Sequence, residues 1–284
     1  MKTKTLNLGD TTKRVRLLGS LGLLTCSSAA SGAVIVPVSY DFGTDPGKTT
    51  FAAAGFTVAS GGTGQATNLA ENVLLDRSDK VAGGFNNVGL LQAFAGLGGG
   101  ETNNFTVTTR YTLTTFDVAN ANNERVGGIH LFADTANDTG INNSGITLKL
   151  IGSNGNNNDS FQMRAGLSGS VLQSSTTSLG YDFAQGDIFD LTATGTFSGT
   201  TLNLMFSVIR NGGTVQSISR NFDTVTDAAL LDGTFSGVSM RIKTTTGSSF
   251  DTFSVIPEPS AFLLLSSGLL GWAMLRRRPG SIQA

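Results

Sequence analysis

Cysteine, histidine and tryptophan are almost absent from this chain of 284 residues, which holds one of each. The single cysteine, Cys26, lies in a hydrophobic stretch near the N-terminus, so residues 34–255 contain no thiol. Disulfide bonds, thiolate metal sites and cysteine nucleophiles are therefore excluded for that region. His130 has no second histidine with which to form a zinc site, and no G-x-S-x-G motif indicates a serine hydrolase. Because His130 alternates with Ile129 and Leu131, we expect an exposed histidine on the outer side of a strand.

Charged residues are also scarce, at 14% of the chain against about 25% in typical globular domains. Residues 34–255 hold 11 basic and 18 acidic residues, a net charge of −7. This balance argues against nucleic acid as a partner, because phosphate binding needs clustered lysine and arginine. Paired carboxylates for glycoside hydrolysis are missing as well: Asp187 and Asp190 are three apart, which places them on opposite sides of a regular strand. No catalytic residue is assigned.

Glycine and phenylalanine are plentiful instead, with 37 and 18 residues respectively. No helical periodicity of any length occurs, whereas apolar and polar residues alternate in several short runs that are typical of strands. The turn-rich sequence Asn211-Gly212-Gly213 lies between two β-like runs and predicts a hairpin. The alternating runs and the turn together predict an all-β fold, an antiparallel β-sandwich formed by residues 34–255. The alternating runs are residues 105–113, 146–151, 161–167, 188–194, 202–209, 238–242 and 250–255.

The N-terminal residues 1–33 have the pattern of a secretory signal peptide. A basic segment precedes the apolar run Leu17–Leu24, and small residues follow it. This order favours cleavage after Ala33 and export by the Sec machinery. The alternatives are cleavage after Ala30, a lipoprotein modified at Cys26, or a buried helix.

The C-terminal residues 256–280 combine three features in order. Pro257, Glu258 and Pro259 interrupt regular structure. The 16 residues from 260 to 275 carry no charge, which predicts a single transmembrane helix close to the lower length limit of about 17 residues. Arg276, Arg277 and Arg278 follow as a positive stop on the cytoplasmic side, and residues 281–284 form a short tail. The basic N-terminal segment is cytoplasmic too, so residues 34–255 face outward.

This order of Pro-Glu-Pro, hydrophobic helix and arginine cluster closely resembles the PEP-CTERM sorting signal of exported proteins in Gram-negative bacteria. The resemblance implies recognition by an exosortase, a membrane-embedded transpeptidase. It also implies an inner-membrane intermediate, held by the C-terminal helix before processing, and delivery to the outer surface or extracellular matrix. The alternative is a plain C-terminal membrane anchor.

Four segments of the body resemble the concanavalin A-like, laminin-G-type jelly roll. Tyr40-Asp41-Phe42 is similar to its first strand, and residues 125–132 to a strand with a glycine pair before an apolar run. Residues 183–189 are similar to a strand entry, and residues 249–255 to the last strand. The resemblance implies that the last strand pairs with the first.

Calcium is the cofactor that the loops suggest, because hard cations take several oxygen ligands. One candidate group is the loop that holds Asn154, Asn156, Asn158 and Asp159. A second is Asp41 with Asp251, which the pairing of first and last strands would bring together; residues 134–138 are a third. The alternative for each is an ordinary solvated turn.

The expected function follows mostly from the predicted location. We expect an exported, non-enzymatic β-sandwich protein with a structural or adhesive role in exopolysaccharide or biofilm. A lectin-like carbohydrate-binding module is the alternative, and a glycoside hydrolase is a third possibility. The aromatic residues do not favour a sugar-stacking site, since Trp272 lies in the tail and the tyrosines are scattered.

Overall fold

The computed structural model describes the β-sandwich but not the two ends of the chain. Contacts divide the chain into two units, Met1–Gly32 and Ala33–Ala284, and the described residues all belong to the second. Among them, no helix is long and apolar enough to cross a membrane. The described residues are 38–41, 55–61, 64–68, 72–77, 86–93, 104–116, 124–135, 144–153, 159–167, 170–242 and 246–257.

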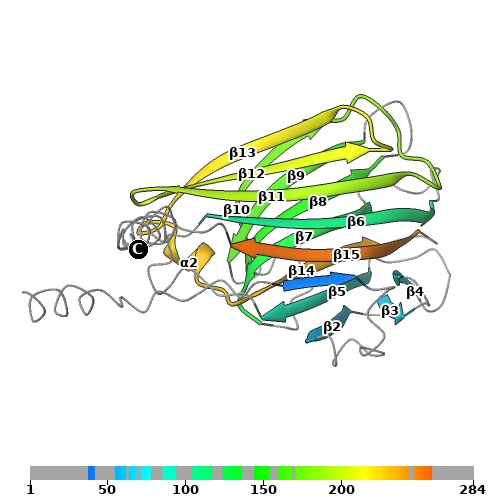
Figure 1. Cartoon of the computed structure of the whole chain (residues 1–284), viewed down its shortest axis with the longest axis horizontal. Coiled ribbons are helices and arrows are strands. Elements are labelled where there is room, and N and C mark those ends of the chain that lie inside the picture. Colours follow the sequence, from blue (N-terminus) through cyan, green and yellow to red (C-terminus); the bar gives the residue numbers. More distant parts are fainter. Residues whose placement is uncertain are drawn as a thin grey trace, which may run out of the picture. The chain divides into compact units, whose positions relative to one another are not determined.

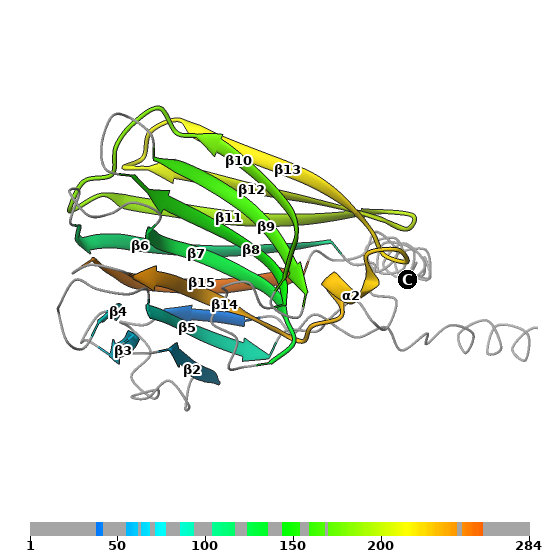
Figure 2. The same cartoon turned by 180° about the vertical axis from the view of Figure 1, so that it is seen from behind.

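The described residues form two antiparallel sheets, which lie as two layers in Figures 1 and 2. Sheet A has the order β13 (Val215–Asp223), β12 (Thr201–Arg210), β11 (Ile188–Ser198), β6 (Phe105–Thr115), β15 (Gly247–Pro257), β4 (Val73–Arg77) and β3 (Gly64–Asn68), with β1 (Val38–Asp41) also paired to β15. Sheet B has the order β10 (Ser170–Ser178), β9 (Ser160–Leu167), β8 (Gly145–Gly152), β7 (Glu124–Ala133), β14 (Phe235–Ile242), β5 (Asn86–Ala93) and β2 (Phe56–Gly61). The short helix α2 (Ala228–Leu231) precedes β14.

The core lies between the sheets and explains the alternation in the sequence. In β6, β11 and β12 every second side chain is buried, and the residues between them are partly or fully exposed. Apolar side chains from both sheets form one cluster, in which aromatic rings meet edge to face. The ring centroids of Phe105 and Phe132 are 6.0 Å apart, and those of Phe56 and Phe253 are 5.9 Å apart. Burial of this large apolar area is the main force that holds the two sheets together.

The predicted sandwich and its strands are confirmed. Each of the seven alternating runs lies within a strand of the structure. The predicted hairpin is also present: β12 and β13 pair across a turn in which Asn211 has a φ of 51° and Gly212 one of 69°. Asn211 stabilises the turn through its side chain, because Oδ1 accepts a hydrogen bond from the Ile188 amide and Nδ2 donates one to Asp187.

The first and last strands pair, as the jelly-roll resemblance implied. Tyr40 lies opposite Phe253, and Asp41 lies opposite Thr252. Strand β15 continues two residues beyond the predicted run and ends at Pro257. Proline is tolerated there because the end of a strand need not supply another ladder hydrogen bond.

The prediction of an exposed histidine is wrong. His130 does lie on the side of β7 opposite Ile129 and Leu131, but it is fully buried. Its Nε2 is 2.8 Å from the carbonyl oxygen of Ser144. Alternation gives the side of the sheet on which a residue lies, but it does not show whether that side is covered.

Candidate functional site

The outer face of sheet A carries side chains in rows, because neighbouring strands pair in register. One row, which we call the hydroxyl row, contains only serine and threonine and crosses six strands. None of its side chains is buried. Adjacent strands are about 4.8 Å apart, so the hydroxyl groups repeat at roughly that interval. The members of the hydroxyl row are Ser217, Ser207, Thr192, Thr108, Ser254 and Ser39.

The next row contains an ion pair between neighbouring strands. Arg110 of β6 lies opposite Asp190 of β11. Its Nε donates to Oδ1 at 2.6 Å, and its Nη2 donates to Oδ2 at 3.0 Å. The pair is therefore bidentate, and both side chains remain open to solvent, with exposed fractions of 55% and 35%.

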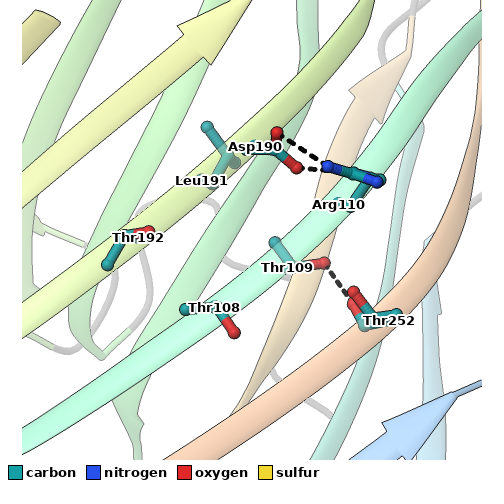
Figure 3. Close-up of a pocket in the computed structure, with 7 residues that line it drawn as sticks. All are labelled: Thr108, Thr109, Arg110, Asp190, Leu191, Thr192 and Thr252. Atoms are coloured by element: carbon teal, nitrogen blue, oxygen red, sulfur yellow. Dashed lines mark hydrogen bonds and ion pairs between the residues drawn. The ribbon is translucent and has the colours of Figure 1, made fainter. Parts of the chain in front are cut away.

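A depression of about 280 Å³ lies beside this pair (Figure 3). In Figure 3 the side chain of Arg110 points to Asp190, and the labelled threonines of β6, β11 and β15 lie on one side of the two. Thr109 donates a hydrogen bond of 2.6 Å to the carbonyl of Thr252, which lies next to a register shift in β15. The depression thus offers hydroxyl groups, a carboxylate and a guanidinium in a small open space. It is lined by Thr108, Thr109, Arg110, Asp190, Leu191, Thr192 and Thr252.

The charges around the depression influence one another. The hydrogen bonds and the charge of Asp190 raise the pKa of Arg110, with a smaller contribution from Asp251. Burial raises the pKa of Asp251; Arg110 opposes this shift, while Asp41 and Asp190 add to it. Two carboxylates, Asp190 and Asp251, therefore act on the guanidinium of Arg110.

Exposed apolar side chains are concentrated on the same face. Among the described residues, six large apolar side chains are exposed. By the strand register, four of these six belong to the outer face of sheet A. A face that carries both a hydroxyl row and exposed apolar side chains can contact the hydroxyl groups and the C–H faces of sugars. These four are Ile188, Met205, Val215 and Ile256.

The residues predicted to bind calcium lie in different parts of the fold. Asp41 is opposite Thr252, the residue after Asp251, so this pair is brought close together. Asp159 is instead fully buried, and it accepts hydrogen bonds from the backbone amides of Ser153 and Phe183. Burial raises its pKa, and these hydrogen bonds act in the opposite direction. Asn154, Asn156 and Asn158 lie outside the described residues. In the described part of the chain, no group of three or more His, Cys, Asp or Glu residues is placed to hold a metal ion, and calcium binding stays a prediction.

Most of the predicted processing residues also lie outside the described part. These are Ala33, Glu258, Pro259, the helix 260–275 and Arg276, Arg277 and Arg278. Pro257 is described, and it is the last residue of β15. The sorting signal therefore begins directly at the end of the last strand of the sandwich.

The sequence did not reveal the depression. Arg110 and Asp190 are 80 positions apart, and no local pattern signals their contact. The only available signal was the series of threonines in residues 105–113, which indicated that one side of this strand is polar.

The tail matches a known motif. Residues 255–278 match the PEP-CTERM protein-sorting motif, so the predicted sorting signal is confirmed. The motif implies export and sorting to the cell surface through an exosortase. No match to the chain was found among curated proteins.

The sandwich is similar to solved lectin structures. Lectin II from Ulex europaeus aligns with a TM-score of 0.54 at 11% identity, over 79% of this chain and 99% of the lectin. Lectin UEA-II complexed with galactose gives a TM-score of 0.53 at 11% identity, over 78% of this chain and 99% of the lectin. Peanut lectin with a bound peptide gives 0.52 at 14% identity, over 78% and 97%. At such low identity the likeness concerns the fold alone, and it confirms the concanavalin A-like sandwich.

Proposed function

We propose that this PEP-CTERM protein is an exported carbohydrate-binding protein that binds polysaccharide on the outer face of sheet A. The observation that carries the proposal is the exposed Arg110–Asp190 pair, which lies in an open depression beside the hydroxyl row. The protein would act at the cell surface or in the extracellular matrix, where a binding module supports adhesion.

The pair is suited to sugar recognition for a chemical reason. A carboxylate accepts several hydrogen bonds, and a guanidinium has five donors, so the pair retains capacity after its two mutual bonds. Sugar hydroxyl groups both donate and accept, and charge-assisted hydrogen bonds of this kind are about twice as strong as neutral ones. Thr108 and Thr192, which lie opposite each other in the neighbouring row, add hydroxyl groups that rotate to suit the ligand.

The arrangement favours binding over catalysis. Glycoside hydrolysis needs one carboxyl group as an acid and a second as a base or nucleophile. Here Asp190 is committed to a bidentate contact with Arg110, and it is the one carboxylate among the described residues that line the depression. Similarity to lectins supports the same proposal, although a shared fold does not by itself imply a shared function.

The test uses an array of neutral polysaccharides and the full chain kept in mild detergent. We expect binding that Arg110→Gln and Asp190→Asn each weaken by about tenfold or more, because a charge-assisted hydrogen bond contributes about 1.5–3 kcal/mol. Arg220→Gln and Asp232→Asn are the matched controls, since each removes the same charge away from the depression. Asp232 is exposed, and Arg220 lies on the edge strand β13, where it contacts Ser175 of β10 in sheet B.

Folding is checked separately, because loss of binding by an unfolded variant would carry no information. An exposed ion pair contributes about 0–1 kcal/mol to stability, so both variants should unfold almost like the unchanged protein. If the two site variants bind neutral polysaccharide as tightly as the controls, or if nothing on the array binds, the proposed function is wrong.

A further inference from the structure

The outer face of sheet A repeats one chemistry across its strands but not along them. Across the strands, the hydroxyl row offers a serine or a threonine on each of six neighbouring strands. Along β11, in contrast, the side chains on this face change from Ile188 to Asp190 and then to Thr192. A polymer that repeats one unit therefore meets a repeating partner when it crosses the strands, and an irregular one when it follows them.

The rows on either side of the hydroxyl row add apolar side chains. The register places Val215 and Ile209 in the row that holds the ion pair, and Met205 and Ile256 in the row on the other side. Val215, Met205 and Ile256 are exposed, and Ile209 is half-buried. A chain of sugars that lies along the hydroxyl row can therefore pair its hydroxyl groups with the row and pack its C–H groups against these neighbours.

The charges on this surface disfavour an acidic polymer. Among the described residues of the hydroxyl row and the two rows beside it, Arg110 is the one basic side chain, and Asp190 already holds it. Asp41 lies in the same row as the pair, and the charge of Asp251 acts on Arg110 as well. These carboxylates would repel a negatively charged ligand, so the surface favours neutral sugars.

We infer that the outer face of sheet A binds a single extended chain of a neutral β-linked polysaccharide, such as a 1,4-β-glucan, which lies along the hydroxyl row at right angles to the strands. Neighbouring strands are about 4.8 Å apart, and one sugar of such a chain advances it by nearly the same distance. Each sugar would thus meet one strand, and a hexamer would span the six strands of the row. This inference rests on the proposed function, that this face binds polysaccharide, and it adds the class of the polysaccharide and its direction.

The twist of a sheet favours a single chain over a flat crystalline surface. Neighbouring strands turn by about 20–25° relative to each other, so hydroxyl groups on six strands do not lie in one plane. A free chain can follow this turn by rotation about its glycosidic bonds, whereas a rigid crystal face would contact a few strands at most. An α-linked glucan coils instead of extending, so it would leave the row after its first few sugars.

The experiment compares two series of glucose oligosaccharides, from dimer to octamer, which differ only in their β-1,4 or α-1,4 linkage. Binding to the full chain in mild detergent is measured by calorimetry. We expect the affinity for the β-linked series to rise by about two- to tenfold per sugar, which corresponds to one net hydrogen bond, and to level off near the hexamer. The α-linked series should show no gain beyond the trimer.

Valine variants remove a hydroxyl group without changing the shape of the side chain. Thr108→Val and Thr192→Val should each weaken binding of the β-linked hexamer by about two- to tenfold. Thr112→Val and Thr196→Val are the matched controls, because each lies on the same strand and the same face, about 13 Å further along. The controls should bind like the unchanged protein. All four variants should melt like it too, since valine is well tolerated in strands.

Four results would overturn the inference. These are equal binding of the two series, an affinity that stops rising at the dimer, equal losses in the row variants and the controls, and retention on crystalline cellulose without binding of the soluble hexamer. Binding of neutral polysaccharide that depends on Arg110 and Asp190 would survive each of them, so the proposed function can stand when this inference fails. Loss of all binding on the neutral array would instead refute the proposed function, and this inference with it.

Discussion

The hydroxyl group of Tyr111 is the clearest local defect of the core, and its removal should stabilise the protein. Tyr111 is fully buried, and its ring stacks between Phe189 and Phe250 at centroid distances of 5.2 and 5.0 Å. Its hydroxyl oxygen has no hydrogen-bond partner among the described residues. Burial raises the pKa of this group well above its ordinary value, so it stays neutral and unpaired.

The magnitude follows from the cost of an unsatisfied group. A buried polar group that loses its hydrogen bonds to water costs about 1–3 kcal/mol. Tyr111→Phe removes this cost, while the ring and its stacking partners stay in place. We therefore expect the free energy of unfolding to rise by about 1–2 kcal/mol. For a domain of this size that corresponds to a melting temperature about 2–8 °C higher.

The measurement is urea or thermal unfolding of the two proteins under the same conditions. Tyr181→Phe is the control, because Tyr181 is only half-buried. The guanidinium carbon of Arg210 lies over its ring, 4.5 Å from the centroid, and this contact does not use the hydroxyl group. The free energy of unfolding of Tyr181→Phe should differ from that of the unchanged protein by no more than about 0.5 kcal/mol. A loss of about 1 kcal/mol or more in Tyr111→Phe, which is the value of one hydrogen bond, would refute the reasoning, because it would mean that a buried water satisfies the hydroxyl.

Two further predictions concern pH and processing. Burial raises the pKa of Asp251, so its carboxyl group binds a proton more tightly in the folded state than in the unfolded state. The ionised carboxylate therefore destabilises the fold as pH rises through the folded pKa. Asp251→Asn should therefore be more stable than the unchanged protein at about pH 7 and equal to it at about pH 3 in urea unfolding; lower stability at neutral pH would contradict this. The PEP-CTERM motif implies that an exosortase processes the tail near Pro257. Intact-mass analysis of surface protein from an exosortase-positive host should therefore show a chain without Trp272. A surface form that retains Trp272 would contradict processing.

The fold was largely predictable, because alternation is a local property. Along most of β6 and β11 buried side chains alternate with partly or fully exposed ones, and the sequence shows this directly. Strand β13 was not among the alternating runs. It lies at the edge of sheet A, and most of its side chains are exposed or half-buried, so it has few apolar residues to form a pattern. Strand β10 is similar, being an edge strand rich in serine and threonine.

The candidate sites were much less predictable. Asp41 and Asp251 were placed together correctly by the expectation that first and last strands pair, but Asp159 turned out to be a buried cap for two backbone amides. The expectation for His130 failed for a related reason, because covering of an outer face depends on segments elsewhere in the chain. The Arg110–Asp190 pair has no signature in any short stretch of sequence, because its two residues are 80 positions apart.

By itself the sequence determined the sorting tail, the all-β class and the acidic character of the body. Each of these depends on composition, on order along the chain or on a period of two residues. The tertiary structure alone decided which residues share a surface. Strand register brought Arg110 to Asp190 and Thr108 to Thr192, because hydrogen bonds between distant strands fix which side chains lie opposite one another. The sequence thus indicates where the protein is sent, and the packing of its two sheets shows what it presents there.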